Sequence, residues 1–172
     1  MTPTLNISRL VLPQGGEVAL CRMPGTHGDL AGDVQAMAQL GIACVVTLTP
    51  LNELHKAGSL SLPTLLAQRG MAWHHFPVTD FDAPSSNQTP HWQRLAKHLH
   101  GLLDQDQRIL VHCYAGRGRS GMVAMRLLVE RGVSPAQALI QVRAVREGAI
   151  ERRVQFDWAA DQVDAQGWQE LN

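Results

Sequence analysis

The chain has 172 residues and 45% hydrophobic content, enough to bury one substantial core and too few residues for two. We therefore expect a single domain over residues 1–172. Its 15 Lys and Arg residues equal its 15 Asp and Glu residues, so no bulk positive charge favours nucleic acid or an anionic membrane as a partner. No apolar run reaches the roughly 18 residues of a spanning helix, which argues against membrane insertion.

The three cysteines indicate a reducing compartment. Cys21, Cys44 and Cys113 are odd in number and widely spaced, a usage typical of free thiols rather than of a disulfide framework. We expect a cytoplasmic monomer in which one of these thiols is available for chemistry.

Short β-branched runs alternate with stretches of helical periodicity along the chain. Thr89-Pro90 and Ser134-Pro135 are helix starts, and Gly41 and Gly148 are helix stops. In chain order, the predicted elements are strand 17–20, helix 30–40, strand 42–48, helix 62–68, strand 72–78, polar loop 79–88, a helix from residue 89, strand 108–112, helix 122–130, helix 135–147 and helix 151–163.

Strands separated by helices predict an α/β fold. We expect a central, mainly parallel sheet with helices on both faces, and ligand sites beyond the carboxyl ends of its strands. Cys113 follows the predicted strand 108–112 directly, and a helix comes next. Cys113 is therefore expected at such a site.

The segment 113–121 has the composition of a phosphate-binding loop, or P-loop. Gly116, Gly118 and Gly121 allow the backbone to curl so that successive amides face one point, and the following helix adds its N-terminal dipole. A phosphate ester needs such converging donors. The same positive field stabilises a thiolate, which makes Cys113 the candidate nucleophile.

Other residues of this loop complete the predicted chemistry. Arg119 presents a planar fork that can hold two phosphoryl oxygens, and Ser120 can donate its hydroxyl to the Cys113 sulfur when that sulfur becomes a leaving group. His112 is expected to brace the loop. The residues expected to bind the phosphoryl group are Tyr114, Ala115, Gly116, Arg117, Gly118 and Arg119.

Each of these residues also has an ordinary explanation. A cysteine that ends a buried strand is usually a small core residue, a Gly-rich turn is usually only a turn, and an Arg behind it is usually solvated. A chance origin would require all of them to fall together between a strand and a helix, with five residues between Cys113 and Arg119. The combination favours a site.

At this point the sequence resembles a family. Residues 112–121, with Cys113, five residues, Arg119 and Ser120, are similar to the signature of the protein tyrosine phosphatase superfamily. The resemblance extends from about Gly41 to Trp158 and is strongest to the dual-specificity branch, in particular to the cyclin-dependent-kinase-associated phosphatases. Further anchors are HHFPVTD at 74–80 and GAI at 148–150. This family implies a phosphocysteine intermediate and neither metal nor cofactor.

The leaving alcohol of a phosphate ester needs a proton, and a carboxyl group on a loop can supply it for ~10²–10⁴ in rate. Asp80 and Asp82 are the candidates in the polar loop 79–88. Asp80 matches the general-acid position that the family places after this strand, and Asp82 is the alternative. An Asp in a polar turn is also common without any such role.

The last predicted helix departs from the pattern of the family. Many members carry two glutamines there, the first of which orients the attacking water. Gln155 matches the second position, whereas Glu151 stands at the first. An ionised Glu151 is expected to be repelled by phosphate and to turn outward, toward Arg117 or Arg152. Glu151 can equally be a favourable acid in the first turn of a helix.

The eight histidines do not predict a metal site. His98 and His100 are two apart on a helix, His74 and His75 alternate across a strand, and neither pair makes a ligand face. Cys21 and Cys44 are expected to be core thiols. Arg143 and Arg146 are expected on a solvated helix face.

The sequence leaves several functions open. The first is a phosphomonoester hydrolase whose substrates are phosphorylated proteins or small phosphomonoesters. A second is a module of the same fold that binds a phosphorylated ligand with little or no turnover, as the altered Gln position would allow. Arg117 adds a cation suited to phosphoinositides. A sulfurtransferase of the rhodanese type is disfavoured by the loop length and by the Asp80 loop.

Overall fold

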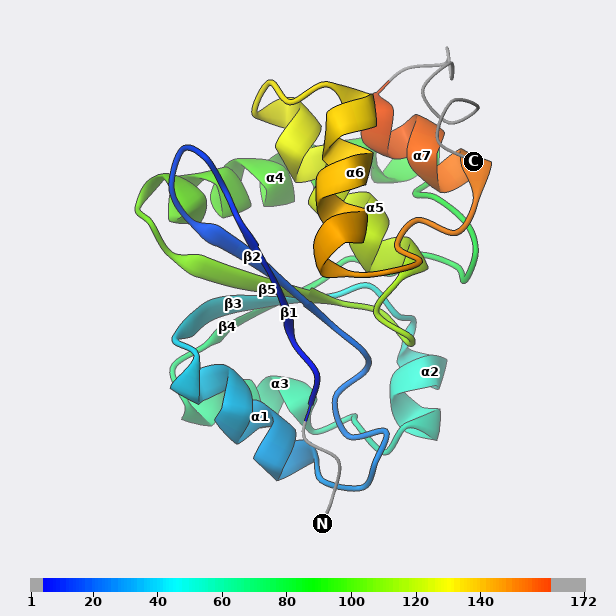
Figure 1. The fold of residues 1–172 in the computed structure, drawn as a ribbon. Helices are drawn as coiled ribbons and strands as arrows, with labels where there is room; N and C mark the ends of the chain where they lie inside the picture. The colour runs from blue at the N-terminus through cyan, green and yellow to red at the C-terminus, as the bar shows by residue number, and fades with distance from the viewer. Residues whose placement is uncertain (1–4, 162–172) are drawn as a thin grey trace.

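The computed structural model describes residues 5–161, which form a five-stranded sheet covered by helices on both faces (Figure 1). The strand order is β1-β2-β5-β3-β4, with β1 antiparallel to β2 and the other neighbours parallel. The strands are β1 (Ser8–Val11), β2 (Glu17–Cys21), β3 (Ile42–Thr47), β4 (Ala72–His75) and β5 (Arg108–His112). The expectation of a mainly parallel sheet is confirmed.

The helices form two layers. Helices α1, α2 and α3 lie on one side of the sheet in Figure 1, and α4, α5, α6 and α7 lie on the other. Their bounds are α1 (Leu30–Gln39), α2 (Leu51–Lys56), α3 (Leu62–Gln68), α4 (Thr89–Asp104), α5 (Gly118–Glu130), α6 (Pro135–Val145) and α7 (Arg153–Ala160), and a 3₁₀ turn (Ser86–Gln88) precedes α4.

Two hydrophobic clusters fill the space between sheet and helices. In β5, Ile109 and Val111 belong to the cluster under α4 and α5, whereas Leu110 belongs to the cluster above α1 and α3. This division follows from the two-residue period of a strand, which sends successive side chains to opposite faces. The central side chains of β5 are apolar on both faces of the sheet because helices cover both faces.

The structure corrects several predicted elements. Strand β1 and helix α2 were not expected. Strand β4 ends at His75 rather than at residue 78, although Phe76 N and Val78 N still donate to the carbonyls of Thr47 and Leu48. Helix α5 begins at Gly118, four residues before the predicted start at 122. The predicted end of the last helix, Val163, lies outside the described residues.

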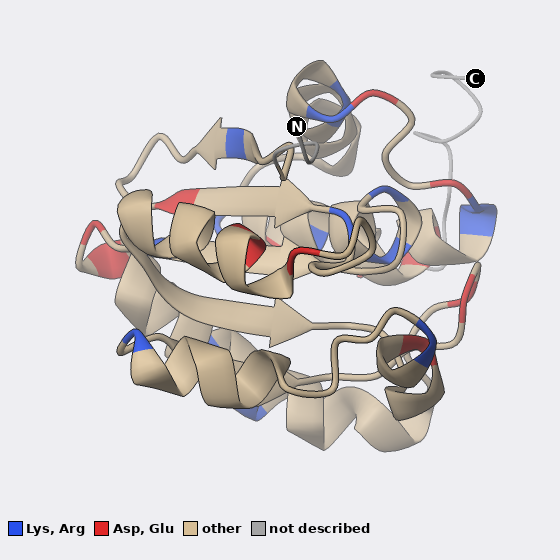
Figure 2. Ribbon diagram, turned by 90° about the horizontal axis from the view of Figure 1, so that it is seen from below, with Lys and Arg blue, Asp and Glu red and all other residues tan. Residues whose placement is uncertain are grey.

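Charged residues concentrate at one end of the sheet. Figure 2 shows Lys and Arg together with Asp and Glu on the loops beyond the carboxyl ends of the parallel strands. Within residues 5–161, none of the helices is long and apolar enough to cross a membrane.

Candidate active site

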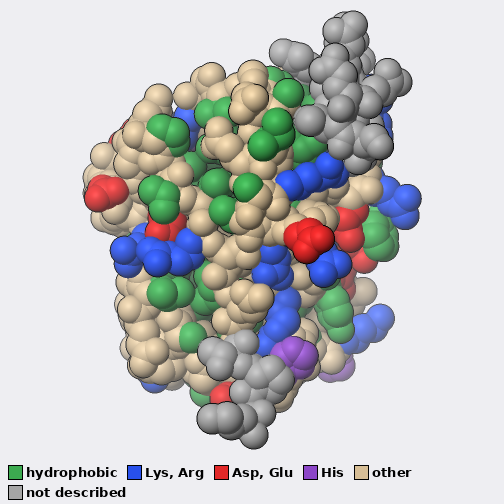
Figure 3. All heavy atoms as spheres, in the orientation of Figure 1, with side chains coloured by type: hydrophobic (Ala, Val, Ile, Leu, Met, Phe, Trp, Pro, Cys, Tyr) green, Lys and Arg blue, Asp and Glu red, His purple; other side chains and the backbone are tan. Residues whose placement is uncertain are grey.

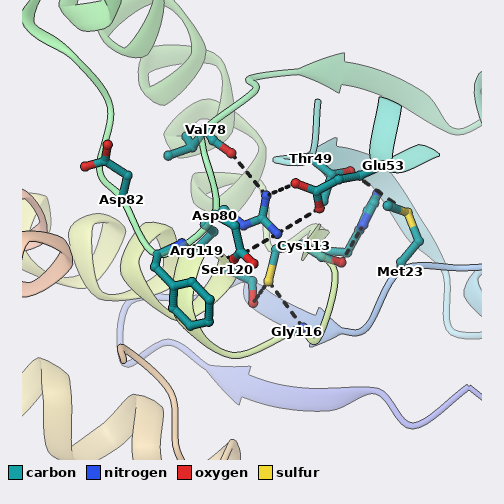
Figure 4. Close-up of polar contacts among 12 residues, drawn as sticks. Met23, Thr49, Glu53, Val78, Asp80, Asp82, Cys113, Gly116, Arg119 and Ser120 are labelled. Atoms are coloured by element: carbon teal, nitrogen blue, oxygen red, sulfur yellow. Dashed lines mark hydrogen bonds and ion pairs between the residues drawn. The ribbon is translucent and has the colours of Figure 1, made fainter. Parts of the chain in front are cut away.

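Cys113 follows the central strand β5 at its carboxyl end. Its side chain is buried, with 2% exposure, at the base of the loop 113–119, here called the Cys113 loop. The amide of Gly116 donates to Cys113 Sγ at 3.2 Å, and Ser120 Oγ lies 3.4 Å from the same sulfur (Figure 4). The sulfur therefore has two donors suited to a thiolate.

The carbonyls of the Cys113 loop are bonded to groups outside it. Met23 N donates to the Tyr114 carbonyl, Arg146 donates to those of Ala115 (3.1 Å) and Gly116 (2.8 Å), and Gly121 N and Ile150 N donate to that of Arg117. In a planar peptide the N–H points opposite to the C=O. The amides of this stretch therefore face the inside of the loop, above the sulfur, where they form an anion-binding cradle.

Gly116 is required by the path of this loop. Its φ is +72°, and a Cβ there would meet the Cys21 carbonyl carbon and oxygen at 2.4 Å. Gly70 has the same φ of +72°, and a Cβ there would meet nothing within 4 Å. Substitution of Gly70 would therefore cause backbone strain alone, whereas substitution of Gly116 would cause the same strain and a steric collision as well.

We predict that Gly116→Ala destabilises the protein by more than the ~1–2 kcal/mol that a left-handed residue costs, and that it removes most activity. Gly70→Ala should show the strain alone and retain full turnover. Chemical unfolding and hydrolysis of para-nitrophenyl phosphate measure both effects. Equal stability and activity in the two variants would show that the contact between Gly116 and Cys21 has no role.

The sequence predicted a solvated helix face for Arg143 and Arg146, and the structure corrects this expectation. Besides its bonds to the Cys113 loop, Arg146 contacts Asn6 O and Ser8 Oγ near β1 at 3.4 Å. Arg143 donates to the carbonyls of Ala149 and Ile150. Arg146, the residue that caps α6, therefore supports the Cys113 loop from outside, and Arg143 of α6 holds the segment at Ala149 and Ile150.

Arg119 lies within the first turn of α5, with only 1% of its side chain exposed. Its Nη1 and Nη2 each donate at 2.9 Å to Glu53 of α2, and Nη1 also donates to Val78 O at 3.1 Å. Burial lowers the pKa of Arg119, but the Glu53 hydrogen bonds and the charges of Cys113, Glu53 and Asp80 outweigh it and raise that pKa. The guanidinium is fixed and permanently charged.

One edge of the Arg119 fork remains for a ligand. Its Nε is buried and finds no hydrogen-bond partner among residues 5–161. Asp80 Oδ1 lies 3.2 Å from Nη2 at the same edge. A buried donor without an acceptor costs free energy, so this edge is suited to an oxyanion.

The two candidate acids lie differently. In Figure 4, Asp80 points toward Arg119 and Cys113, whereas Asp82 points away from them. Asp80 Oδ1 accepts from the amide of Phe81, and Asp82 Oδ1 accepts from that of Ala83. Asp80 is thus the carboxylate placed over the Cys113 loop.

His112 is buried in a hydrogen-bonded chain. Trp73 Nε1 donates to Thr47 Oγ1 at 2.8 Å, and Thr47 Oγ1 lies 2.7 Å from His112 Nε2. The Cys113 carbonyl, 3.3 Å from His112 Nδ1, can only accept, so Nδ1 carries the proton of the neutral ring and Nε2 accepts from the Thr47 hydroxyl. Burial, followed by the charges of Arg119 and His75, lowers the pKa of His112 to about 4, against the raising effect of the Cys113 carbonyl.

We predict an acid-sensitive contribution of His112 to stability. The unfolded His112 binds its proton near pH 6.5 and the folded one only near pH 4, so stability decreases as pH falls from about 6.5 to about 4. The slope is about 1.4 kcal/mol per pH unit within this window. Guanidinium unfolding at several pH values should show that the free energy of unfolding depends less steeply on pH in His112→Gln than in the wild type. Identical slopes in the two proteins would contradict the predicted role of His112.

Glu151 and Gln155 lie beside the start of α5. A Cβ at Gly118 would meet Glu151 Oε2 at 2.3 Å and Gln155 Nε2 at 3.0 Å. Glu151 lies two residues before α7, and within the described chain no ion pair joins it to Arg117 or Arg152. Gln155 Oε1 accepts from the amides of Glu151 and Arg152, and its Nε2 donates to Asp82 O at 3.4 Å.

Sequence reasoning missed Glu53. Helix α2 has only six residues, but Pro50 before it and an acid in its first turn are helix-start signals that could have located it. Figure 3 shows basic side chains next to acidic ones on the face of the molecule turned toward the viewer, where the two helical layers meet.

Comparison with known proteins identifies the family. Residues 21–133 match the Tc-R-P family model, described as a polymorphic toxin system DSP-PTPase phosphatase. Cyclin-dependent kinase inhibitor 3 of Rattus norvegicus is 31% identical over 149 residues, which cover 82% of this chain and 69% of the relative. The protein of the same name from Homo sapiens is 29% identical over 162 residues, covering 90% of this chain and 74% of the relative.

Solved structures agree with these matches. Kinase associated phosphatase (KAP), with its catalytic-site cysteine replaced by serine, has a TM-score of 0.83 at 27% identity, covering 94% of this chain and 95% of that chain. Tk-PTP in its active form has a TM-score of 0.72 at 30% identity, covering 90% of this chain and 95% of that chain. The resemblance found in the sequence is thereby confirmed, and this chain belongs to the dual-specificity branch of the cysteine-dependent protein tyrosine phosphatases.

Proposed function

We propose that Cys113, Arg119 and Asp80 hydrolyse phosphate monoesters in two steps. The Cys113 thiolate attacks phosphorus, the bond from phosphorus to the ester oxygen breaks, and Asp80 protonates the leaving alcohol. Asp80 then takes a proton from water, which attacks the phosphocysteine and releases inorganic phosphate and the Cys113 thiolate. The observation that carries this proposal is the Cys113 loop itself, whose carbonyls from Tyr114 to Arg117 are bonded outward while the amide of Gly116 donates to Cys113 Sγ.

The other residues of the site have supporting roles in this proposal. The amides of the Cys113 loop and the edge of Arg119 that carries Nε hold the equatorial phosphoryl oxygens. Ser120 donates to Cys113 Sγ as the thiolate leaves, and His112 fixes the start of the loop. Gln155, beside Gly118 and bonded to the Asp82 carbonyl, is placed to orient the attacking water, with Glu151 next to it.

Phosphorylated proteins and small phosphomonoesters are the proposed substrates. Tyr114 and Arg117 are exposed on the Cys113 loop and would contact the group that carries the phosphate. The described cysteines are free thiols, which supports a reducing compartment such as the cytoplasm for an enzyme that needs Cys113 reduced. We further propose that the whole chain acts as one phosphatase domain and as a monomer.

Substrate assays decide between the proposed function and its alternatives. The protein should release phosphate from para-nitrophenyl phosphate and from phosphotyrosine and phosphothreonine peptides. A phosphoinositide phosphatase would instead prefer soluble phosphoinositides over these peptides, consistent with the exposed Arg117. Peptide binding without turnover would identify a phospho-ligand module, and transfer of sulfur from thiosulfate to cyanide would identify a sulfurtransferase.

The assignment of Asp80 gives a prediction about the leaving group. Asp80→Asn should lower turnover of an alkyl phosphate by ~10²-fold or more and that of para-nitrophenyl phosphate much less, because para-nitrophenol leaves without protonation. Asp82→Asn is the matched control, since Asp82 points away from the site (Figure 4), and should have little effect. The reverse order would make Asp82 the general acid.

A further inference from the structure

A second cluster of reactive side chains lies on elements that the catalytic proposal does not use. It consists of Cys44 on β3, His74 on β4 and His98 on α4, here called the Cys44 cluster. One ligand atom from each residue lies within 4.8 Å of the other two. This cluster was not predicted from the sequence, because its two histidines are 24 positions apart and neither His74 with His75 nor His98 with His100 makes a ligand face.

The sheet register explains how the cluster forms. Val46 is paired with His74, and Cys44 lies two residues before Val46 on the same face of the sheet. Helix α4 covers this face through Leu95 and Leu99, which brings His98 over the strands. Cys44 is completely buried, whereas His98 is exposed, so the cluster extends from the core to the surface.

His74 is the member whose bonding is incomplete. Its Nε2 is buried and has no hydrogen-bond partner within residues 5–161. Its ring centroid is 4.9 Å from that of His98, at an interplanar angle of 59°, so the rings do not stack. A neutral imidazole has a nitrogen lone pair to offer a metal.

We propose that the Cys44 cluster binds one Zn²⁺ ion, with a thiolate, two imidazoles and a water molecule as ligands. Thiolate and imidazole are the ligands that Zn²⁺ prefers, and three protein ligands with one open position are a known zinc arrangement. Metal bonds of ~2.0–2.3 Å separate tetrahedral ligand atoms by about 3.3–3.8 Å. The ligand atoms lie within 4.8 Å of one another in the structure, and small rotations of the exposed His98 side chain would bring them to the shorter distances of a zinc site.

Binding exchanges a proton for the metal. Cys44 is a free thiol that is buried in the core. Zn²⁺ would form the bond to Cys44 Sγ while one proton leaves to solvent. His91, whose ring packs edge-on against Phe76, is not among the residues whose ligand atoms lie within 4.8 Å of one another.

The bound ion would connect the edge strand to the helix that covers it. His74 lies on β4, and Asp80 follows that strand after a short segment. A metal clip between β3, β4 and α4 would therefore stabilise the base of the loop that carries the proposed general acid. This role is structural and separate from the chemistry at Cys113.

Cobalt spectroscopy tests the proposal directly. The full chain with Cys113→Ser should be used, because a reactive thiolate at Cys113 could itself bind metal. Titration with Co²⁺ should give a thiolate-to-cobalt charge-transfer band that saturates at one equivalent and is removed by Zn²⁺. Adding Cys44→Ala or His98→Ala should abolish the band, whereas His55→Ala, which changes an exposed histidine on α2, should leave it unchanged.

The variants keep the test decisive. His98 is exposed, so His98→Ala should fold even if Cys44→Ala, which opens a cavity in the core, does not. Absence of a charge-transfer band in the Cys113→Ser protein would overturn the proposal. So would a band that persists at full intensity in the variant that also carries His98→Ala.

Discussion

Replacing Cys113 with serine is expected to reduce hydrolysis of para-nitrophenyl phosphate by at least ~10³-fold. A serine hydroxyl is not ionised at neutral pH, and the donors around Cys113 Sγ, Gly116 N and Ser120 Oγ, supply no base to deprotonate it. The amides of the Cys113 loop and Arg119 do not depend on the sulfur. Binding of inorganic phosphate or vanadate, measured by calorimetry, should therefore persist in Cys113→Ser.

These two measurements separate chemistry from binding. Loss of both activity and anion binding would mean that the substitution had deformed the Cys113 loop, which circular dichroism and thermal unfolding would reveal. Activity that survives at more than a few per cent would contradict Cys113 as the nucleophile. The same variant, if it retains binding, can capture phosphorylated substrates from a mixture.

Arg119→Lys is expected to be nearly as damaging as Arg119→Ala, with a loss of ~10²–10³-fold in kcat. The guanidinium uses two nitrogens to hold Glu53, at 2.9 Å each, and still has Nε for a phosphoryl oxygen. An ammonium group cannot face both partners with a fixed geometry. Because lysine keeps the positive charge, the loss of kcat in Arg119→Lys reports the contribution of the guanidinium geometry.

Arg126→Lys is the matched control on the same helix. Arg126 bonds Glu130 at 2.7 Å on α5 and lies away from the Cys113 loop, so its change to Lys should leave kcat near that of the wild type. Glu53→Gln should give an intermediate loss, because the amide keeps the shape of the carboxylate but not its charge. Near-normal kinetics for Arg119→Lys would contradict the proposed binding of phosphoryl oxygen by the Arg119 guanidinium.

Local features of the chain were predictable from the sequence. The Cys113 loop is encoded within seven residues, 113–119, where glycines, a thiol and a guanidinium follow a β-rich run. The alternation of strands and helices was sufficient to predict a mainly parallel sheet, and the sheet is confirmed. The antiparallel strand β1 was missed because only four residues, mostly not buried, carry its pattern.

Contacts between distant segments were not predictable. Glu53 and Arg119 are 66 positions apart, and nothing near either residue indicates the other. Arg146 has the sequence context of a solvated helix residue, yet the fold places the Cys113 loop against it. The Cys44 cluster combines three elements in the same way. Such partners depend on how the layers are assembled, which periodicity does not encode.

The outward carbonyls of the Cys113 loop have a consequence for evolution. In the proposed site the main chain supplies the anion-binding groups, and the side chains of Tyr114, Ala115 and Arg117 are exposed at the rim. Changes at these three positions can alter which molecules are admitted without rebuilding the anion holder. Selectivity can therefore drift or be engineered independently of reactivity, and a library randomised at these positions should yield altered preferences at nearly constant turnover of the smallest ester.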